Sequence, residues 1–404
     1  MEILASAPQR LGLGQKGGFP RLRVWRDGTL VAGGTAGRHE RISGEQLLRL
    51  RDHLRQGGGL TPEALDREGF GDINLCGGYW AVQSGDGGRT WSAVTSDMLR
   101  VLSGCSSGNL LELADGTLLG TYTFMINTVL GSAQGQELIV FRSADQGQTW
   151  QVELAPVTGP AQCDPFWGDG HLAGTFYNSL LELPSGALLL FGISWFAGDT
   201  RYRTVVYRSD DAGHSFRYLS TVADETFLAI PDLPFSLCEP GVARLPGGEL
   251  LCFMRSVEYA PIYRSLSADE GRTWSRPERA GAKGILPNPV LLDNGVLALS
   301  HGRPGVWVSF SEDGRGDWWN RRTCVWVWNS LWGEGHLPKT PHYTTPGYWT
   351  FERSDCNADL RQIAPNRLMV VYNAPVEPDT GAPIDHHHGP GESGVWALTL
   401  EVRR

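Results

Sequence analysis

The chain has 404 residues, a formal net charge of −9 at pH 7 and no cluster of basic residues, which argues against nucleic acids and anionic membrane surfaces as partners. Its 52 glycines and 24 prolines favour many short strands joined by turns, and its length suits one large repeat domain. No apolar run approaches the length of a membrane span.

The first residues, MEILASAPQRLGLG, contain no apolar segment of the kind found in a signal peptide. The seven cysteines are scattered and show no Cys-x-x-Cys spacing, which favours free thiols over disulfides or a zinc site. These features predict a cytoplasmic protein that uses no metal and no cofactor. They leave its oligomeric state open.

An apolar run, a tight turn and a second apolar run recur along the chain. Glycine or asparagine at such a turn supplies the positive φ that a short hairpin needs. The repeats are roughly 45–90 residues long, which fits the four-stranded blades of a β-propeller. The turns fall at Asp27-Gly28, Asp115-Gly116, Ser185-Gly186, Gly247-Gly248, Asn294-Gly295 and Asn366-Arg367.

One segment of the first repeat has a helical pattern instead. Residues 43–46, SGEQ, form a capping box, and leucines follow at helical spacing until the glycines at 57–59. We therefore predict a short helical insertion over about residues 43–70 in the first blade, not a separate domain.

A second motif, Ser-x-Asp-x-Gly-x-Thr-Trp, alternates with the hairpins. In such a turn the aspartate bonds nearby backbone, the glycine adopts positive φ, and the aromatic ring packs on the hairpin. We expect it to join the third and fourth strands of each blade, facing away from the site, with a structural role. Three copies match the motif closely, and they lie at Ser84–Trp91, Ser143–Trp150 and Ser267–Trp274. A looser copy lies at Ser209–Phe216, and a degraded copy lies at Ser311–Trp318.

Together the two motifs predict an all-β fold. The expected architecture is a six-bladed β-propeller with four-stranded antiparallel blades, in which residues 1–404 form a single domain. No linker that would divide the chain is visible.

Hairpin counting locates a candidate site. Residues equally far before and after a turn lie side by side. Counting from the turn near Gly247 places Glu239 beside Arg255, at the end of the hairpin opposite the turn. The same count places Arg21 beside Thr35 in the first blade.

Other blades bring polar and aromatic groups to the same end. Three arginines on separate blades suit bidentate recognition of a carboxylate, although each could instead pair locally on a solvated loop. Counting places Asn288 beside Arg303 and Asn357 and Asp359 beside Asn373, and the third blade contributes Tyr177 and Trp195. Asp72 precedes the next strand of the first blade and belongs to the same end, and Arg38 and His39 of that blade are further candidate substrate contacts.

In its motifs the chain resembles the sialidase superfamily along nearly its whole length. CEPGVARLPGGELLCFMRS, HGRPGVWVSFSEDG and, less closely, FPRLRVWRDGTLVAG resemble segments that carry the family's site. The resemblance implies that Arg255, Arg303 and Arg21 hold a substrate carboxylate, and that Glu239 polarises a tyrosine nucleophile. It also implies an acid/base on a first-blade loop, here Asp72, with Asp66, Glu68 and His39 as alternatives.

The sequence departs from the family at the nucleophile. In SDCNADLRQIAPNRLMVVY, Asn357 stands at the tyrosine position, and an amide cannot form the covalent intermediate. Tyr348 or Tyr343 could supply a phenol from an earlier loop. Otherwise water attacks directly, with Glu239 or Asp359 as base, and the anomeric configuration inverts.

The leading hypothesis is an exo-glycoside hydrolase that cleaves a terminal acidic sugar. One alternative is a propeller polysaccharide lyase acting on uronate-containing glycans, with His39 or a tyrosine as base. Another is a carbohydrate-binding propeller without chemistry. We interpret the run His386–His388 as part of a solvated loop rather than a metal site. The sugar and its linkage stay open.

Overall fold

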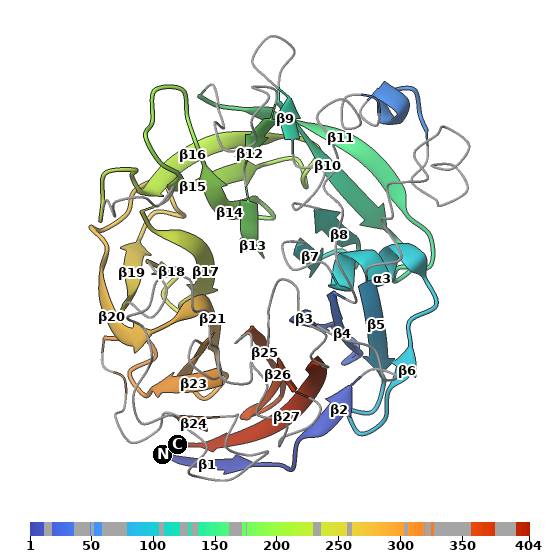
Figure 1. The fold of residues 1–404 in the computed structure, drawn as a ribbon, viewed down its shortest axis with the longest axis vertical. Helices are drawn as coiled ribbons and strands as arrows, with labels where there is room; N and C mark the ends of the chain where they lie inside the picture. Colours follow the sequence, from blue (N-terminus) through green and yellow to red (C-terminus); the bar gives the residue numbers. More distant parts are fainter. Residues whose placement is uncertain are drawn as a thin grey trace.

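The fold is built almost entirely from β-sheets that follow one another around a ring (Figure 1). The strands β3, β7, β13, β17, β21 and β25 lie nearest the centre of that ring. The computed structural model describes residues 1–11, 18–35, 49, 52–58, 79–104, 109–121, 128–130, 136–160, 172–174, 176–228, 236–256, 261–302, 306–317, 319, 325–326, 357–375 and 393–404.

Three of the sheets each consist of four consecutive antiparallel strands. The first contains β3 (Gly18–Val24), β4 (Leu30–Thr35), β5 (Tyr79–Ser84) and β6 (Ser92–Ala93). The second contains β17 (Cys238–Arg244), β18 (Leu250–Arg255), β19 (Pro261–Ser267) and β20 (Glu278–Lys283). The third contains β21 (Ile285–Leu291), β22 (Leu297–Gly302), β23 (Val306–Ser311) and β24 (Val325–Trp326).

An eight-stranded sheet is made of two four-stranded antiparallel halves. Their outer strands, β11 and β16, pair in parallel through Val157 with Phe216 and Thr158 with Arg217. One half contains β7 (Asn109–Glu112), β8 (Leu118–Thr121), β10 (Gln136–Ser143) and β11 (Gln151–Thr158). The other contains β13 (Phe176–Glu182), β14 (Leu188–Ser194), β15 (Arg203–Ser209) and β16 (Phe216–Ala223). A separate two-stranded sheet pairs β9 (Thr128–Leu130) with β12 (Leu172–Gly174).

The two ends of the chain meet in the last sheet. β25 (Ala358–Ala364), β26 (Arg367–Pro375) and β27 (Ser393–Arg403) form antiparallel pairs in sequence order. β1 (Glu2–Ala5) and β2 (Gln9–Leu11) then pair with β27. This pairing of the first strands with the last one closes the ring, and it covers the strand edge of β27.

Each of the six predicted hairpins is present, and each joins an inner strand to the next strand of its sheet. The predicted chemistry of the turns is also seen. The Asp27 carboxylate accepts the N–H of Thr29 at 2.8 Å, and Asp115 accepts that of Thr117 at 2.9 Å. Between Asp27 and Thr29, Gly28 has a positive φ of +86°.

The Ser-x-Asp turns join the outer strands, as predicted. In the turn after β5, the Ser84 hydroxyl donates to Asp86 Oδ1 at 2.8 Å and accepts the Gly88 N–H at 2.9 Å. Asp86 Oδ1 also accepts the N–H of Thr90 at 2.9 Å. The serine–aspartate and serine–glycine bonds recur in the turns after β10, β15, β19 and β23.

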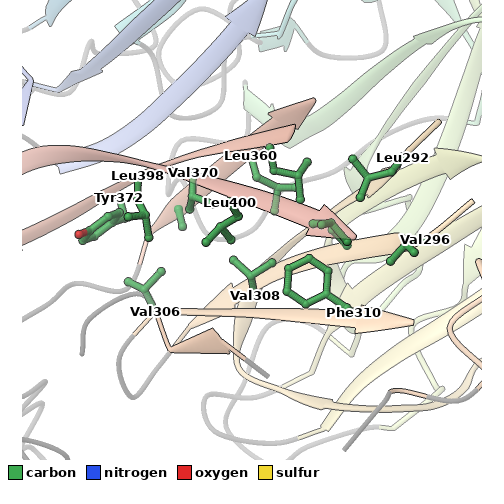
Figure 2. Close-up of a cluster of buried hydrophobic side chains, with 14 residues drawn as sticks. Leu292, Val296, Val306, Val308, Phe310, Leu360, Val370, Tyr372, Leu398 and Leu400 are labelled. Carbon is green, nitrogen blue, oxygen red and sulfur yellow. The ribbon is translucent and has the colours of Figure 1, made fainter. Parts of the chain in front are cut away.

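The hydrophobic core is divided into clusters that lie between successive sheets and between the two halves of the eight-stranded sheet. Figure 2 shows one of them, in which Val308 and Phe310 of β23 face Leu398 and Leu400 of β27. Each of these four side chains is 0–1% exposed, and full burial of such a side chain contributes about 1.5–3 kcal/mol. A further cluster joins the last sheet to the first, so the sheets stack face to face all around the ring.

The predicted helical insertion is described only in part, and there it is helical at residues 49 and 52–55. Arg55 of this segment contacts Glu137 of β10, with 2.7 Å between Nη2 and Oε2. None of the helices in the described part of the chain has the length and apolar character needed to cross a bilayer.

A second helix, α3 (Asp97–Gly104), was not predicted. Leu99 and Leu102 of this helix are buried against the first two inner hairpins, in one cluster with Trp25. The Ser96 hydroxyl accepts the N–H of Leu99 at 3.4 Å. This capping serine, followed by apolar residues at helical spacing, was the signal that could have identified it.

Gly241 marks the closest approach of β17 to β21. A Cβ atom on Gly241 would lie 1.9 Å from the Pro287 carbonyl oxygen, which is backbone and cannot move aside. We expect Gly241→Ala to lower the free energy of unfolding by about 1–3 kcal/mol or more, measured by urea denaturation. The control is Gly85→Ala, where a Cβ would meet nothing within 4 Å. Equal stability of the two variants would contradict this.

Candidate functional site

A β-bulge interrupts several inner hairpins at the same height. Between β17 and β18, Cys238 pairs with Arg255 and Gly241 pairs with Phe253, so two residues of β17 lie opposite one residue of β18. A bulge redirects side chains and is common beside active sites. Comparable shifts occur between Gly18 and Arg21, between Tyr177 and Ser179, and between Ile285 and Asn288.

The bulge in β17 directs Glu239 toward the neighbouring sheet. Glu239 has φ 50°, and Leu286, in the bulge of β21, has φ 45°. The Leu286 N–H donates to Glu239 Oε2 at 3.1 Å, and the same oxygen lies 3.3 Å from Arg255 Nε. The Glu239 side chain is 25% exposed and that of Arg255 is 12% exposed. The carboxylate is therefore fixed from two sheets and still reaches solvent.

Arg255 is also held from its own sheet. Its Nε donates to Cys238 Sγ at 3.3 Å. Burial raises the pKa of the Cys238 thiol to about 11, against a smaller opposite effect of the Arg255 charge. The thiol is therefore neutral, and the carboxylate that balances Arg255 here is Glu239.

Asp359 lies deeper, with no exposed side-chain surface. Burial alone would raise the pKa of Asp359. The positive charges of the nearby Arg361, Arg23 and Arg21 together outweigh this effect, so the pKa of Asp359 lies below its ordinary value. A carboxylate so buried and so fully bonded is suited to holding strands together. Its donors are Leu22 N (2.9 Å), Arg23 Nη1 (3.2 Å), Leu360 N (2.9 Å), Arg361 Nη1 (2.8 Å) and Asn288 Nδ2.

Hairpin counting from the sequence predicted one contact of the site correctly and another incorrectly. The predicted contact between Glu239 and Arg255 is confirmed. The predicted pairing of Arg21 with Thr35 is wrong, because the ladder that starts at Val24 and Leu30 beside the turn places Arg21 opposite Gly33, and Thr35 pairs with Gly18 beyond the bulge.

The same correction applies in β21, where the ladder that starts at Leu291 and Leu297 places Asn288 opposite Ser300, although the count had expected Arg303 there. In the last sheet the expected neighbours do meet, since the Asn373 N–H donates to the Asn357 carbonyl at 3.3 Å. The Asn357 side chain is buried.

The aromatic candidates come from the third inner hairpin. Tyr177 lies on β13 opposite Gly192. Trp195 follows β14, where its indole N–H donates to the Asp199 carbonyl at 2.9 Å and its ring packs edge-on against Tyr202, with 5.2 Å between centroids. The remaining candidates lie outside the described residues: Asp72, Tyr348, Tyr343, Arg303, Arg38, His39, Asp66, Glu68 and His386–His388.

The centre of the ring holds a cavity of about 360 Å³ lined by inner strands of several sheets. Arg21, Arg23 and Arg361 line it together with Asn288. Arg23 and Arg361 were missed in the sequence, although each is two residues from a candidate, and a spacing of two puts side chains on the same face of a strand. Within the described part of the chain, no group of three or more His, Cys, Asp or Glu could hold a metal ion.

Residues 123–330 match the model of the BNR repeat-like domain, and no protein of curated function matches the sequence. Among solved structures, the chain resembles a protein of unknown function from Dyadobacter fermentans (18% identity, 99% of both chains, TM-score 0.62). It also resembles a GH93 α-L-arabinofuranosidase of Fusarium graminearum (14%, 97% of both chains, 0.58) and a Hadza microbial sialidase (16%, 89% of this chain and 63% of that one, 0.55). At these identities the likeness shows the fold, a sialidase-like propeller.

His301, on β22, is a buried histidine whose protonation state follows from its partners. Its Nδ1 lies 2.6 Å from the Lys283 carbonyl, which can only accept, so Nδ1 carries the proton. Nε2 then accepts from the Ser309 hydroxyl at 2.8 Å. Burial lowers the pKa of His301 from 6.5 to about 4, with a smaller opposite effect of the Lys283 carbonyl.

This lowered pKa predicts a pH-dependent stability. Between pH 6.5 and about 4 the unfolded chain binds a proton at His301 that the folded chain does not, so acidification favours unfolding. The contribution is fully present above pH 6.5 and falls by about 3 kcal/mol as the pH reaches 4. His301→Gln should flatten the decline in unfolding free energy, measured by urea titration at several pH values. The control variant His214→Gln, at a histidine whose side chain is 58% exposed, should show the same decline as the unmodified chain. If the unfolding free energies of both variants change with pH in the same way, the assignment to His301 is refuted.

Proposed function

The chain belongs to the BNR repeat-like domain family, and we propose that it is a sialidase-like exo-glycoside hydrolase acting on a terminal acidic sugar. We further propose that residues 1–404 form one propeller of six blades. Counting each half of the eight-stranded sheet as a blade gives this number. The pairing of β1 and β2 with β27 and the cluster between the last and first sheets support one closed domain.

The pair formed by Glu239 and Arg255 is the observation that carries the proposal. Both residues lie at the end of an inner hairpin opposite its turn, where a bulge and the Leu286 N–H fix the carboxylate. A carboxylate held by a backbone N–H and an arginine, and still partly exposed, has the position that acid/base chemistry on a glycosidic bond needs.

The acidic sugar is proposed from the arginines. A guanidinium matches a carboxylate with two parallel hydrogen bonds, and we assign this contact to Arg255, with Arg303 and Arg21 as its partners on other blades. The structural neighbours include a sialidase and an arabinofuranosidase, so the fold alone is compatible with more than one sugar. The specificity for a carboxylate therefore depends on these side chains.

The remaining roles complete the proposal. Asp72 is the proposed acid, and Arg38, His39, Tyr177, Asn357 and Trp195 are proposed substrate contacts. Asp359 is left out of the catalytic pair, because its oxygens are buried and bonded to strand partners. If Tyr348 does not reach the site, water attacks directly with Glu239 as base, and proton NMR of the first product shows an inverted anomer.

Glu239→Gln tests the catalytic assignment. The amide keeps the shape but cannot accept a proton, so we expect kcat/KM to fall about 10²–10⁴-fold. The assay screens aryl glycosides of sialic, ketodeoxy and uronic acids. The control is Glu249→Gln on the same hairpin, since Glu249 pairs with Arg315 (2.9 Å between Oε1 and Nη2) at the turn end. Absence of turnover with every glycoside, or full activity of Glu239→Gln, would refute the proposal.

Arg255→Lys tests the carboxylate contact. Lysine keeps the charge but lacks the planar fork. We expect transition-state binding to weaken by about 2–4 kcal/mol, which corresponds to a fall in kcat/KM of roughly 30- to 1,000-fold. Arg264→Lys is the control, because Arg264 of β19 pairs with Glu278 (2.7 Å between Nη2 and Oε1) on the outer strand. Both variants should fold. Near-normal activity of Arg255→Lys would remove this residue from the site.

A further inference from the structure

The segment that follows β14 forms a tight turn at the mouth of the ring, meaning the end of the inner hairpins opposite their turns. The Asp199 N–H donates to the Phe196 carbonyl at 3.0 Å, and Gly198 between them has φ +93°. Trp195 precedes this turn and Tyr202 follows it, and their two rings pack edge-on. The turn therefore presents an aromatic pair beside β17, which β14 and β15 both contact.

Asp199 is bonded through every one of its polar groups, and these bonds hold the turn together. Its carbonyl accepts the indole N–H of Trp195 at 2.9 Å. Through Oδ2 its carboxylate accepts the Phe196 N–H at 3.1 Å and the Arg203 Nε–H at 2.7 Å. Through Oδ1 it accepts Arg203 Nη2 at 2.5 Å. Asp199 therefore ties the indole of Trp195 to the first residue of β15.

The ion pair between Asp199 and Arg203 is largely withdrawn from water. The Asp199 side chain is 5% exposed and that of Arg203 is 25% exposed. Glu225, from the segment after β16, also contacts this guanidinium, with 2.8 Å between Oε2 and Nη2. Desolvation of such charges offsets much of their attraction, so the pair adds little net stability. A bidentate guanidinium–carboxylate pair does have a fixed planar geometry, and it therefore fixes the position of the turn.

The same strand also holds the segment that leads to Glu239. The second residue of β15, Thr204, is fully buried, and its hydroxyl donates to the Leu237 carbonyl at 2.7 Å. The next residue, Cys238, belongs to a small buried cluster against which Trp195 packs. The first two residues of β15 therefore fix Trp195 and Glu239 relative to each other.

Trp195 stands farther out of the mouth than Arg255 does. Arg255 is five residues beyond Leu250, which begins the ladder of β18, whereas Trp195 is seven residues beyond Leu188, which begins the ladder of β14. At about 3.3 Å per residue, this difference of two residues is roughly 7 Å. When the carboxylate of a terminal sugar meets Arg255, the group at the height of Trp195 is therefore the next unit of the substrate.

The indole of Trp195 offers an apolar surface to such a unit. Its N–H is the only hydrogen-bond donor of the side chain, and the Asp199 carbonyl accepts it inside the turn. The residue is partly exposed. A partly exposed ring without a donor to offer matches the C–H face of a sugar better than a charged or strongly polar group.

We propose that Trp195 stacks on the second sugar of the substrate, the one to which the terminal acidic sugar is linked. Asp199 and Arg203 are positioning residues that hold the indole for this contact. The substrate class is therefore an oligosaccharide that ends in an acidic sugar, and not the glycoside of a small alcohol. The inference rests on the proposed binding of the terminal sugar at Arg255, but it does not depend on the cleavage step.

Binding of two matched probes tests this without turnover. One probe is the methyl glycoside of an acidic sugar, and the other is the same sugar linked to galactose, each prepared with sialic, ketodeoxy and uronic acids. Calorimetric titration uses the full chain with Glu239→Gln, so that the probes stay intact, and the chain with Glu239 in place wherever it cleaves neither probe. The disaccharide should bind more tightly than the methyl glycoside.

Trp195→Ala should weaken disaccharide binding roughly tenfold and change methyl glycoside binding by less than about twofold. Asp199→Asn and Arg203→Lys should each weaken disaccharide binding selectively, because both variants remove the bidentate pair. Added to Trp195→Ala, Asp199→Asn should cause no further loss, since it acts through the indole. If Asp199→Asn does not fold, Arg203→Lys decides the same point.

The control variant is Asp210→Asn, in the Ser-x-Asp turn at the other end of β15. Asp210 also pairs with an arginine, since its Oδ1 lies 2.7 Å from Arg208 Nε. This variant should bind both probes like the parent chain, whereas a general loss of stability would weaken both probes in every variant.

Several outcomes would overturn the proposal. They are equal affinity for the two probes, equal losses for both probes in Trp195→Ala, unchanged disaccharide binding when the Asp199–Arg203 pair is altered, and absence of binding by every probe. Turnover of aryl glycosides is measured separately. A chain that binds the disaccharide through Trp195 but cleaves no glycoside contradicts the hydrolase assignment alone, and a chain that cleaves glycosides without any effect of Trp195 contradicts this inference alone.

Discussion

The buried carboxylate of Asp359 is the interaction on which the centre of the molecule depends. It joins three sheets, because its donors come from β3, β21 and β25. Removing one partner of such a network leaves an uncompensated buried charge, at a cost of about 3–5 kcal/mol. The first and last sheets meet at this carboxylate, so it helps to close the ring at its axis, as the pairing of β1 with β27 does at its rim.

Closure of the ring determines what the sheets can present at their ends. Each of six core clusters is shared by two successive sheets or by the two halves of the eight-stranded sheet, so no sheet can shift without disturbing its neighbours, and dense packing resists such shifts. The hydrogen bond from Leu286 N to Glu239 crosses one of these boundaries. The position of Glu239 is therefore a property of two sheets and not of one loop.

Much of this architecture could be predicted from local sequence, because its turns have local chemistry. Asp27-Gly28 and the Ser-x-Asp motifs specify their turns through residues within a few positions, and these turns formed as expected. The bulges were not predicted, since a single additional residue leaves the apolar alternation nearly unchanged while it shifts every pairing beyond it. This is why Gly18, beyond the bulge, pairs with Thr35, whereas the expected pairing of Arg21 with Thr35 missed the register that the turn itself sets.

Other features depend on contacts between distant segments. The parallel pairing of Val157 with Phe216 joins the two halves of the eight-stranded sheet, but neither strand contains a signal for its neighbour. The gathering of Arg23 and Arg361 around Asp359 likewise requires the ring to close, since 336 residues separate Arg23 from the aspartate. A sequence shows which side of a strand a residue occupies, whereas the partner across the axis is set by the whole fold.

Backbone conformation distinguishes the bulge at Glu239 from the strained positions of the Ser-x-Asp turns. Gln146, Ala212 and Glu270 also have positive φ, but each occupies the same position before the glycine of a Ser-x-Asp turn. Positive φ there belongs to a repeated structural turn. Glu239 and Leu286 belong to no such turn.

A non-glycine residue in this conformation costs about 1–3 kcal/mol, and it persists only where surrounding structure imposes it. At Glu239 the imposing contacts are the Leu286 N–H, Arg255 and the close approach of Gly241 to Pro287. The bulge makes Cys238 the ladder partner of Arg255, so that two residues of β17 lie opposite one residue of β18. The strained conformation at Glu239 therefore belongs to an arrangement in which a partly exposed carboxylate lies against an arginine of its own sheet and a backbone N–H of the next sheet, and acid/base chemistry requires a carboxylate held in this way.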